Sequence, residues 1–236
     1  MAGTLHGATQ PPLTRAHGGR DPASRALTAA VAATLGRVAR RRDGAAVHEV
    51  GTAYDARLRV DVGGPISALP PGEIPVTVRI SRGAGLPSAL PDVWGLGLRI
   101  AADDGVQDLL VDSCVAAGPL GRHLPRPRRD LLGGPFGSLL ALRAGGGAFH
   151  LGLFPHRGRR TVDHGEAAGL VCTVAWAPPS GPWRAWGGLR LDRRADDQAV
   201  RLTPTHDALG VGLDPWWARL RARGYAASRA AHPGVG

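Results

Sequence analysis

The sequence predicts a mainly β protein, in which an antiparallel sheet or barrel lies between an N-terminal and a C-terminal helix. First, apolar and polar residues alternate with a period of two from Tyr54 onward, which is typical of half-buried strands. Second, Gly and Pro are frequent, 35 and 20 of 236 residues, and they divide the alternating runs by short links. Third, the Asp-Pro pairs at 21–22 and 214–215 each resemble a helix cap followed by Pro in the first turn.

The N-terminal part is predicted to hold a tail and one helix. Residues 1–20 show no period and are expected to be disordered. The helix is expected over 21–41, where Leu27, Val31 and Leu35 recur every four residues. Residues 37–42 are mostly Arg, which suits the negative end of the helix dipole. We expect residues 21–236 to form a single domain.

The barrel is expected over about residues 45–205. Alternation predicts strands at 54–62, 76–81, 96–100, 109–111, 148–154, 170–176 and 189–191, with a further one near 200–202. Between them, residues 115–135 are rich in Pro and Arg, and residues 139–143 are predicted to form a helical turn. Strands joined by short links favour antiparallel pairing. A final helix is expected over 214–230 and carries Tyr225.

Composition limits the function classes. All 29 basic residues are Arg, against 19 acidic residues, so the net charge is +10, and the sequence contains no Asn. An Arg-rich surface favours anionic ligands, but no aromatic stripe accompanies the charge, so no specific nucleic-acid partner is expected. Docking on nucleic acid or anionic lipid is a weaker alternative.

The cysteines and the apolar runs point to a cytoplasmic protein. Cys114 and Cys172 lie far apart without a metal-binding spacing, so they are predicted to be reduced structural thiols. No apolar run approaches the ~18 residues that span a bilayer, and the N-terminus lacks a secretory pattern. We expect no transmembrane segment, and a homo-oligomer is possible.

Three segments carry the residues that favour chemistry. The first, at 46–51, reads Ala-Val-His-Glu-Val-Gly and contains His48. The second, at 78–85, reads Val-Arg-Ile-Ser-Arg-Gly-Ala-Gly and is followed at 92–99 by Asp-Val-Trp-Gly-Leu-Gly-Leu-Arg. The third, at 221–225, reads Arg-Ala-Arg-Gly-Tyr.

In this order the segments resemble the catalase family. That family has Val-Val-His before the first barrel strand, then a Val-Arg-Phe-Ser strand, an Ala-Gly loop and an Asp-x-x-Gly-Phe-Ala-Val strand. Its next strand reads Asp-Leu-Val, which matches Asp108-Leu109-Leu110, and its axial Tyr follows an Arg by four residues. The resemblance covers about residues 45–112 and 221–229. It implies an antiparallel β-barrel of catalase-like type and haem as the cofactor.

The resemblance implies that Tyr225 binds the haem iron. A free phenol has a pKa near ~10, so it needs help to ionise. Arg221 lies one helical turn earlier, where its charge favours the phenolate, and the iron favours it further.

On the opposite face of the haem, His48 is implied as the distal acid–base. A neutral imidazole can take a proton from peroxide and return it to the leaving oxygen. In the resembled family the serine at the position of Ser81 bonds the distal His, and Arg79, two residues earlier on the same strand face, suits a haem propionate.

The departures from the family narrow the expected activity. Asp112 stands where the family has a distal Asn, and an ionised carboxylate only accepts hydrogen bonds. Ala45 stands where the family has an Arg, and Arg229 is a candidate substitute. The interval from His48 to Tyr225 is also shorter than in full-length catalases. The sequence therefore favours a haem-dependent, peroxidase-like oxidoreductase acting on hydrogen peroxide or organic peroxides. The alternative is a degenerate, non-catalytic barrel that binds haem, a lipid-like ligand or a protein.

Each candidate also has a purely structural interpretation. His48 is compatible with a turn or surface residue, Tyr225 with an anchor for the final helix, and Arg221 and Arg79 with solvated charges. His150, His156 and His164 form no metal-binding spacing and are expected to be structural.

Overall fold

The computed structural model describes residues 51–83, 86–87, 89–115, 118, 120–145, 147–156, 164–195, 202 and 207–213. The tail expected at 1–20 and the helices expected at 21–41 and 214–230 lie outside these residues. So does the strand expected near 200–202, apart from Leu202.

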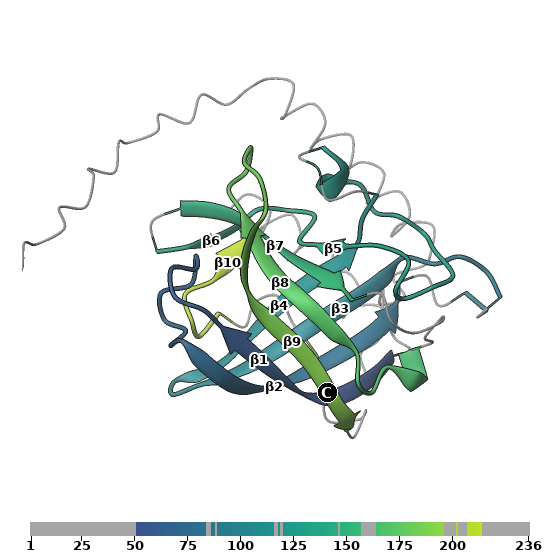
Figure 1. The fold of residues 1–236 in the computed structure, drawn as a ribbon, viewed down its shortest axis with the longest axis horizontal. Helices are drawn as coiled ribbons and strands as arrows, with labels where there is room; N and C mark the ends of the chain where they lie inside the picture. The colour runs from purple at the N-terminus through teal and green to yellow at the C-terminus, as the bar shows by residue number, and fades with distance from the viewer. Residues whose placement is uncertain are drawn as a thin grey trace, which may run out of the picture.

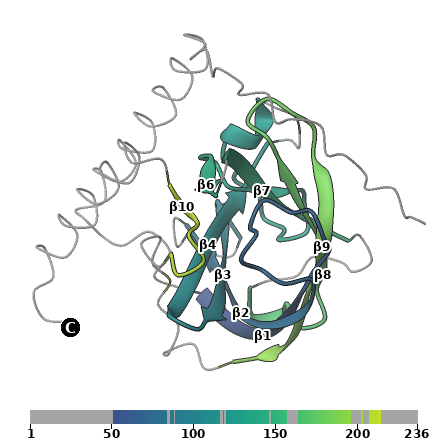
Figure 2. The same cartoon turned by 90° about the vertical axis from the view of Figure 1, so that its left-hand side faces the viewer.

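Eight of the strands in the described part of the chain close into an antiparallel barrel (Figures 1 and 2). In the order of pairing they are β1 (Gly51–Val60), β2 (Gly72–Arg82), β3 (Trp94–Ala102), β4 (Gly105–Ser113), β5 (Phe136–Gly137), β7 (Gly147–Pro155), β8 (Val171–Ala177) and β9 (Arg184–Arg194). The barrel closes because β9 pairs with β1. Two short strands, β6 (Leu142–Ala144) and β10 (Gly212–Leu213), extend the sheet beside β7. The predicted barrel is therefore confirmed.

The alternation in the sequence sets which side of each strand faces the core. On β1, Tyr54, Leu58 and Val60 are buried, whereas Arg57 and Arg59 are exposed. The antiparallel register places apolar partners opposite them, so that Tyr54 faces Val78 across the β1–β2 pair. Aliphatic and aromatic side chains from all of the long strands meet in one continuous core. The strands predicted between residues 54 and 191 are all present, although β1 ends at Val60 rather than at Val62.

The helical turn predicted at 139–143 is wrong. Residues 139–140 form a bend and residues 142–144 form β6, which pairs with the start of β7. Gly145 follows with φ = 48°, a backbone angle that favours glycine and lets the chain reverse into a hairpin. The strands β5 and β10 were not predicted either, because two residues carry no periodicity.

One end of the barrel is closed by polar side chains in specific contacts. The hydroxyl of Tyr54 donates to the backbone carbonyl of His164 and accepts from the backbone N–H of Ala167. His164 begins the short 3-10 helix η2 (His164–Glu166), and its Nδ1 lies 3.0 Å from the hydroxyl of Thr52. The buried Arg82 guanidinium lies 5.2 Å above the Trp94 ring. The contacts of Tyr54 and Thr52 hold η2, in the β7–β8 connection, against β1.

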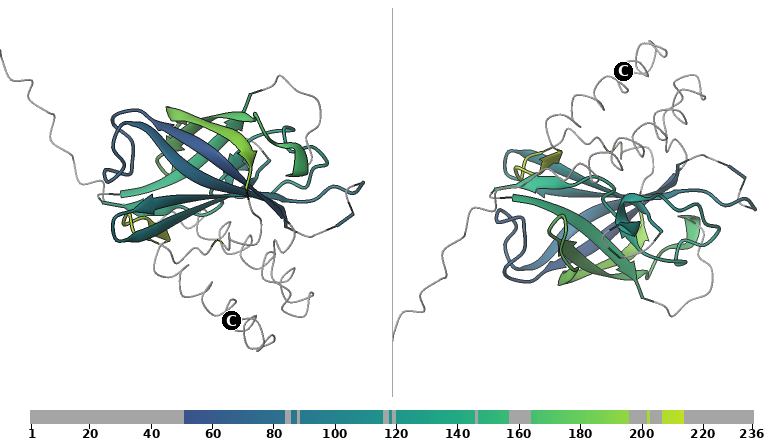
Figure 3. Two further views of the ribbon diagram at one scale, coloured as in Figure 1. Left: turned by 90° about the horizontal axis from the view of Figure 1, so that it is seen from below. Right: turned by 90° about the horizontal axis from the view of Figure 1, so that it is seen from above.

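The other end is closed by the segment that contains β10. Figure 3 shows β10, in yellow, at the same end of the barrel in both views. Val211, which precedes β10, is buried within the core. Within the described residues no helix is both long and apolar enough to cross a bilayer.

Candidate active site

The outer surface of β1–β4 carries three of the residues that the sequence singles out. One cross-strand row runs Gly51, Ser81, Gly95, Asp112 and continues to Gly137 on β5. Residues in one such row point to the same side of the sheet. Ser81 and Asp112 therefore share a face with a glycine between them, roughly 10 Å apart across two strand spacings.

Arg79 belongs to the neighbouring row on the same face. This row runs Ala53, Arg79, Gly97, Leu110, and Arg79 is half-buried. A Cβ at Gly51 would lie 3.0 Å from the guanidinium carbon of Arg79 and 2.5 Å from the carbonyl oxygen of Ile80. The lack of a side chain at Gly51 thus lets the Arg79 guanidinium lie against β1, beside Ser81. The expectation that Arg79 and Ser81 share a face is confirmed.

A third cross-strand row lies next to these two and contains the ion pair between Arg99 and Asp108. Arg99 donates to both carboxylate oxygens of Asp108, over 2.9 and 2.8 Å. These hydrogen bonds raise the pKa of Arg99. Arg79, two residues from Ser81 on β2, lies closer to Ser81 along this face than the Arg99–Asp108 pair does.

Part of this face is covered by the chain itself. A Cβ at Gly97 would lie 1.9 Å from Cδ1 of Leu202 and 3.0 Å from Cδ2 of Leu110. The glycine is thus required for the close approach of Leu202 to β3. The described residues of these three rows are half-buried or buried rather than open to solvent.

The remaining site residues that the sequence predicts are His48, Arg221, Tyr225 and Arg229, and Ala45 is the position at which the family's arginine is missing. All of them lie outside the described residues. Their opposition across a haem therefore stays a prediction, as do the roles assigned to Arg79, Ser81 and Asp112.

Some features of the described part of the site suit haem and others do not. Gly51 and Gly95 carry no side chain on the outer face, which suits a flat ligand, whereas the space over Gly97 is taken by Leu202. Arg79 offers a fork of donors to a carboxylate such as a propionate. Ser81 adds a hydroxyl that can donate or accept. Asp112 departs, because its carboxylate brings a negative charge to the distal side.

The three histidines for which a structural role is expected make hydrogen bonds within the protein. His150 is buried, and its Nδ1 lies 2.9 Å from the carbonyl oxygen of Ser138, which only accepts, so this nitrogen carries the proton. Burial lowers the pKa of His150 to about 4. His156 bonds the Thr173 hydroxyl. Among the described residues, no three His, Cys, Asp or Glu side chains are grouped so that they could hold a metal ion.

The two cysteines are free and buried, as predicted. Burial raises the pKa of Cys114 to about 11 and that of Cys172 to about 12. Both thiols are therefore protonated at neutral pH, and neither is an activated nucleophile.

Two buried arginines in the loop between β4 and β5 were not predicted from the sequence. Arg122, in the 3-10 helix η1 (Gly121–His123), donates to the carbonyls of Gly118, Pro178 and Gly181 and lies 4.7 Å above the Trp183 ring. Arg128 donates to two carbonyls and lies 4.3 Å above the Phe136 ring. Burial lowers the pKa of both arginines, that of Arg128 to about 10. Their acceptors are backbone groups that no residue pattern encodes.

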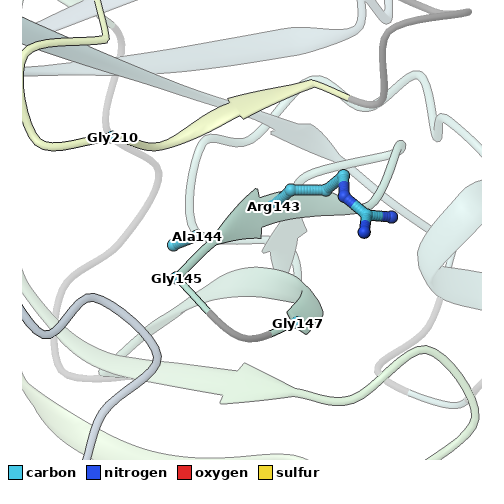
Figure 4. Close-up of a pocket in the computed structure, with 5 residues that line it drawn as sticks. All are labelled: Arg143, Ala144, Gly145, Gly147 and Gly210. Atoms are coloured by element: carbon cyan, nitrogen blue, oxygen red, sulfur yellow. The ribbon is translucent and has the colours of Figure 1, made fainter.

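A shallow pocket of about 210 Å³ lies away from the outer face of β1–β4 that carries Arg79, Ser81 and Asp112 (Figure 4). It is lined by Arg143, Ala144, Gly145, Gly147 and Gly210. The row that contains Asp112 reaches β7 at Gly152, roughly 17 Å further along that strand than Gly147. The pocket is therefore separate from the candidate site.

Comparisons with known proteins support the fold of the chain but identify no sequence family. No family model matches the chain, and no curated protein matches its sequence. The closed antiparallel barrel is nevertheless of catalase-like type. Among solved structures, the chain is similar to catalase A from Saccharomyces cerevisiae, with a TM-score of 0.56 and 12% identity. The match covers 86% of this chain and 64% of that one, so the chain spans less than two thirds of catalase A.

Proposed function

We propose that the chain is a haem-binding, peroxidase-like oxidoreductase that acts on hydrogen peroxide or an organic peroxide. The observation that carries the proposal is the placement of Arg79, Ser81 and Asp112 on one outer face of a catalase-like barrel. These are the residues that match the distal side of the catalase motifs.

Each residue has a task that its chemistry allows. Bound haem would supply a ferric centre with an open position for peroxide. Tyr225, supported by Arg221, holds the iron as a phenolate. Arg79 holds one propionate through its paired donors, and Arg229 is the candidate for the other. His48 accepts a proton from the peroxide and returns it, while Ser81 orients the imidazole.

Asp112 favours peroxidase-like chemistry over catalase turnover. An amide at this position can donate a hydrogen bond to a peroxide oxygen, whereas an ionised carboxylate cannot. The chain would therefore orient a second peroxide molecule poorly. We expect slow disproportionation and faster oxidation of an organic electron donor.

A second candidate function is a barrel without redox activity that still binds haem or another flat apolar ligand. The observation in its favour is Leu202, which packs over Gly97 on the same outer face. Haem binding without any reaction with peroxide supports this candidate.

The test is to reconstitute the purified protein with haem and to record its visible spectrum. We expect a Soret band and ferric high-spin features that Tyr225→Phe abolishes or shifts, and a slower reaction with peroxide in His48→Ala. The only other tyrosine provides the matched control, because Tyr54 lies in the barrel core. Tyr54→Phe is expected to lower stability and leave the ferric spectrum unchanged. Absence of a Soret band after reconstitution overturns the proposal.

A further inference from the structure

The connection between β2 and β3 ends in an exposed tip that is entirely apolar. The sequence from Gly83 to Pro91 contains no charged residue. The connection projects from the barrel at the end where β2 finishes (Figure 1). We call its exposed residues the apolar tip: Leu86, Pro87, Ala89, Leu90 and Pro91.

Two buried charged side chains hold the apolar tip in place. The Arg82 guanidinium donates to the carbonyl oxygens of Pro87 and Leu90, and the Asp92 carboxylate accepts from the backbone N–H of Leu86. The side chains of Arg82 and Asp92 are 5% and 1% exposed, and the Nε of Arg82 lies 3.7 Å from a carboxylate oxygen of Asp92. The tip is therefore fixed from both of its ends.

A buried ion pair is a costly way to hold a surface loop. Burial takes both charges out of water, and their mutual attraction does little more than offset this cost. The exposed parts of Leu86 and Leu90 contribute no hydrophobic stabilisation while they face water. A preformed loop does lower the conformational entropy that is lost on binding. The rigid, exposed tip therefore indicates a partner outside the barrel.

Exposed basic side chains lie beside the apolar tip, on the connection between β4 and β5. Asp92 and Arg128 form a backbone bridge between the two connections, with N···O distances of 3.1 and 2.8 Å. Near this bridge, Arg126 and Arg129 are exposed, and neither has a carboxylate partner among the described residues. Both guanidinium groups are thus available to an external anion.

The carboxylates of these two connections are bonded within the protein. Asp92 accepts from the N–H groups of Leu86 and Val93, and Asp130 accepts from that of Leu132 over 2.8 Å. In the described parts of 83–93 and 114–135, the exposed charged residues are therefore Arg126 and Arg129. The combined surface is apolar and positive, so it is complementary to a partner that is apolar and negative.

We propose that the apolar tip, together with Arg126 and Arg129, is a docking surface for an anionic lipid bilayer. Leu86 and Leu90 enter the interface between headgroups and acyl chains, and the two guanidinium groups pair with lipid phosphates. A projecting loop suits a bilayer, because lipid yields around it, whereas a protein partner needs a matching cavity. The docking requires no haem.

The test measures co-sedimentation of the full chain with phosphatidylcholine vesicles, with and without phosphatidylserine, at physiological ionic strength. We expect binding to the phosphatidylserine vesicles, about tenfold weaker when Leu86→Ser and Leu90→Ser are combined, because the apolar contact with lipid is lost. Val62→Ser is the matched control and should leave binding unchanged. Val62 is 80% exposed and lies in the connection between β1 and β2, at the opposite end of β2.

The positive part of the surface is tested by combining Arg126→Gln with Arg129→Gln. We expect about tenfold weaker binding to the phosphatidylserine vesicles, because both guanidinium groups lie near the headgroups. Arg59→Gln combined with Arg193→Gln removes the same charge from β1 and β9, where these side chains are 66% and 82% exposed. This control should change the affinity less than about twofold, because charges far from the bilayer are screened.

A fluorescent label reports whether the tip itself enters the lipid. Cys114 and Cys172 are buried, so a thiol-reactive dye attaches selectively to Leu90→Cys or, as the control, to Val62→Cys. We expect phosphatidylserine vesicles to shift the emission of an environment-sensitive dye to the blue at position 90 and not at position 62.

Absence of binding to the phosphatidylserine vesicles overturns the proposal. Binding that the two leucine substitutions leave unchanged also overturns it, because charge elsewhere on the chain then holds the protein. Self-association that these substitutions abolish, without a blue shift on vesicles, assigns the tip to a second copy of the chain instead. The Soret band after reconstitution with haem should be the same in every variant, so failure of the docking surface is distinct from failure of the proposed function.

Discussion

Two regions of the barrel's outer surface use the same residue, arginine, in opposite ways. On β1 and β9 the arginines are exposed and pair with carboxylates, as Arg57 does with Glu73 and Asp192. In the β4–β5 loop, Arg122 is completely buried, and its bonding partners are three backbone carbonyls and a Trp ring. The first set screens charge at a solvated surface, whereas the second holds a loop in place.

Because arginine has both of these uses, charge alone does not identify a binding site in this chain. Every basic residue is Arg, so the sequence cannot separate the two uses by residue type. Arg79 belongs to neither set, because it is half-buried on a face lowered by glycines and lies beside Ser81. That intermediate position is what makes it a candidate for binding an anion.

The largest effect is expected at the buried arginine. Arg122→Met should lower the free energy of unfolding by about 4 kcal/mol, because three backbone carbonyls lose their buried donor and the Trp183 ring loses its cation. Arg126→Met, in the same loop but exposed, is the matched control and should leave the urea midpoint unchanged. Equal effects of the two substitutions would remove the distinction between the regions.

Acid should destabilise the folded protein through His150, which is buried. Its folded pKa is about 4, below the ordinary 6.5, because burial disfavours the charged ring beside Arg122 and His123. The unfolded chain then binds a proton that the folded chain does not, so stability is full above pH 6.5 and falls until about pH 4. The loss reaches about 3 kcal/mol.

The contribution of His150 is isolated by substitution. His150→Asn keeps a donor for the Ser138 carbonyl and does not titrate, so the difference in unfolding free energy from the unmodified protein should shrink as pH falls from 6.5 to 4. His156→Asn, at an exposed histidine, should show no such change. A pH-independent difference for His150→Asn would contradict the account.

A smaller effect is expected where an ion pair is only partly covered. In the Arg99–Asp108 pair the Asp side chain is fully buried and the Arg side chain is 21% exposed, so Arg99→Met should cost about 2 kcal/mol. Arg57→Met breaks ion pairs on the exposed wall and should not shift the thermal midpoint measurably. A larger shift for Arg57→Met than for Arg99→Met would reverse the proposed ranking.

The smallest expected effect concerns the thiols of Cys114 and Cys172, which should not react in the folded protein. The pKa values of Cys114 and Cys172, about 11 and 12, predict that neither thiol reacts with a disulfide reagent at pH 8 while the protein is folded. Both should react after denaturation. Rapid modification of either thiol in the folded protein would show that the structure around that cysteine opens readily.

The barrel could be predicted because its signal is local. Alternation along β1 to β4 and along β7 to β9 follows directly from one buried and one outward face. The contacts of Arg122 could not be predicted, because its acceptors are backbone carbonyls, two of them from a distant segment. The face shared by Arg79 and Ser81 was predictable from their spacing on one strand. The position of Gly51 and Gly97 on this same face could not be predicted from local spacing, because it depends on the register between strands.

The most direct test of the central claim is a haem titration of the unmodified protein, Arg79→Gln and Arg57→Gln, followed by absorbance in the Soret region. We expect saturable binding of one haem per chain, about tenfold weaker in Arg79→Gln and unchanged in Arg57→Gln, because Arg79 lies beside Ser81, whereas Arg57 lies six residues further along β1 than Gly51, the partner of Ser81. Absence of saturable binding, or equal affinity in all three proteins, would contradict it.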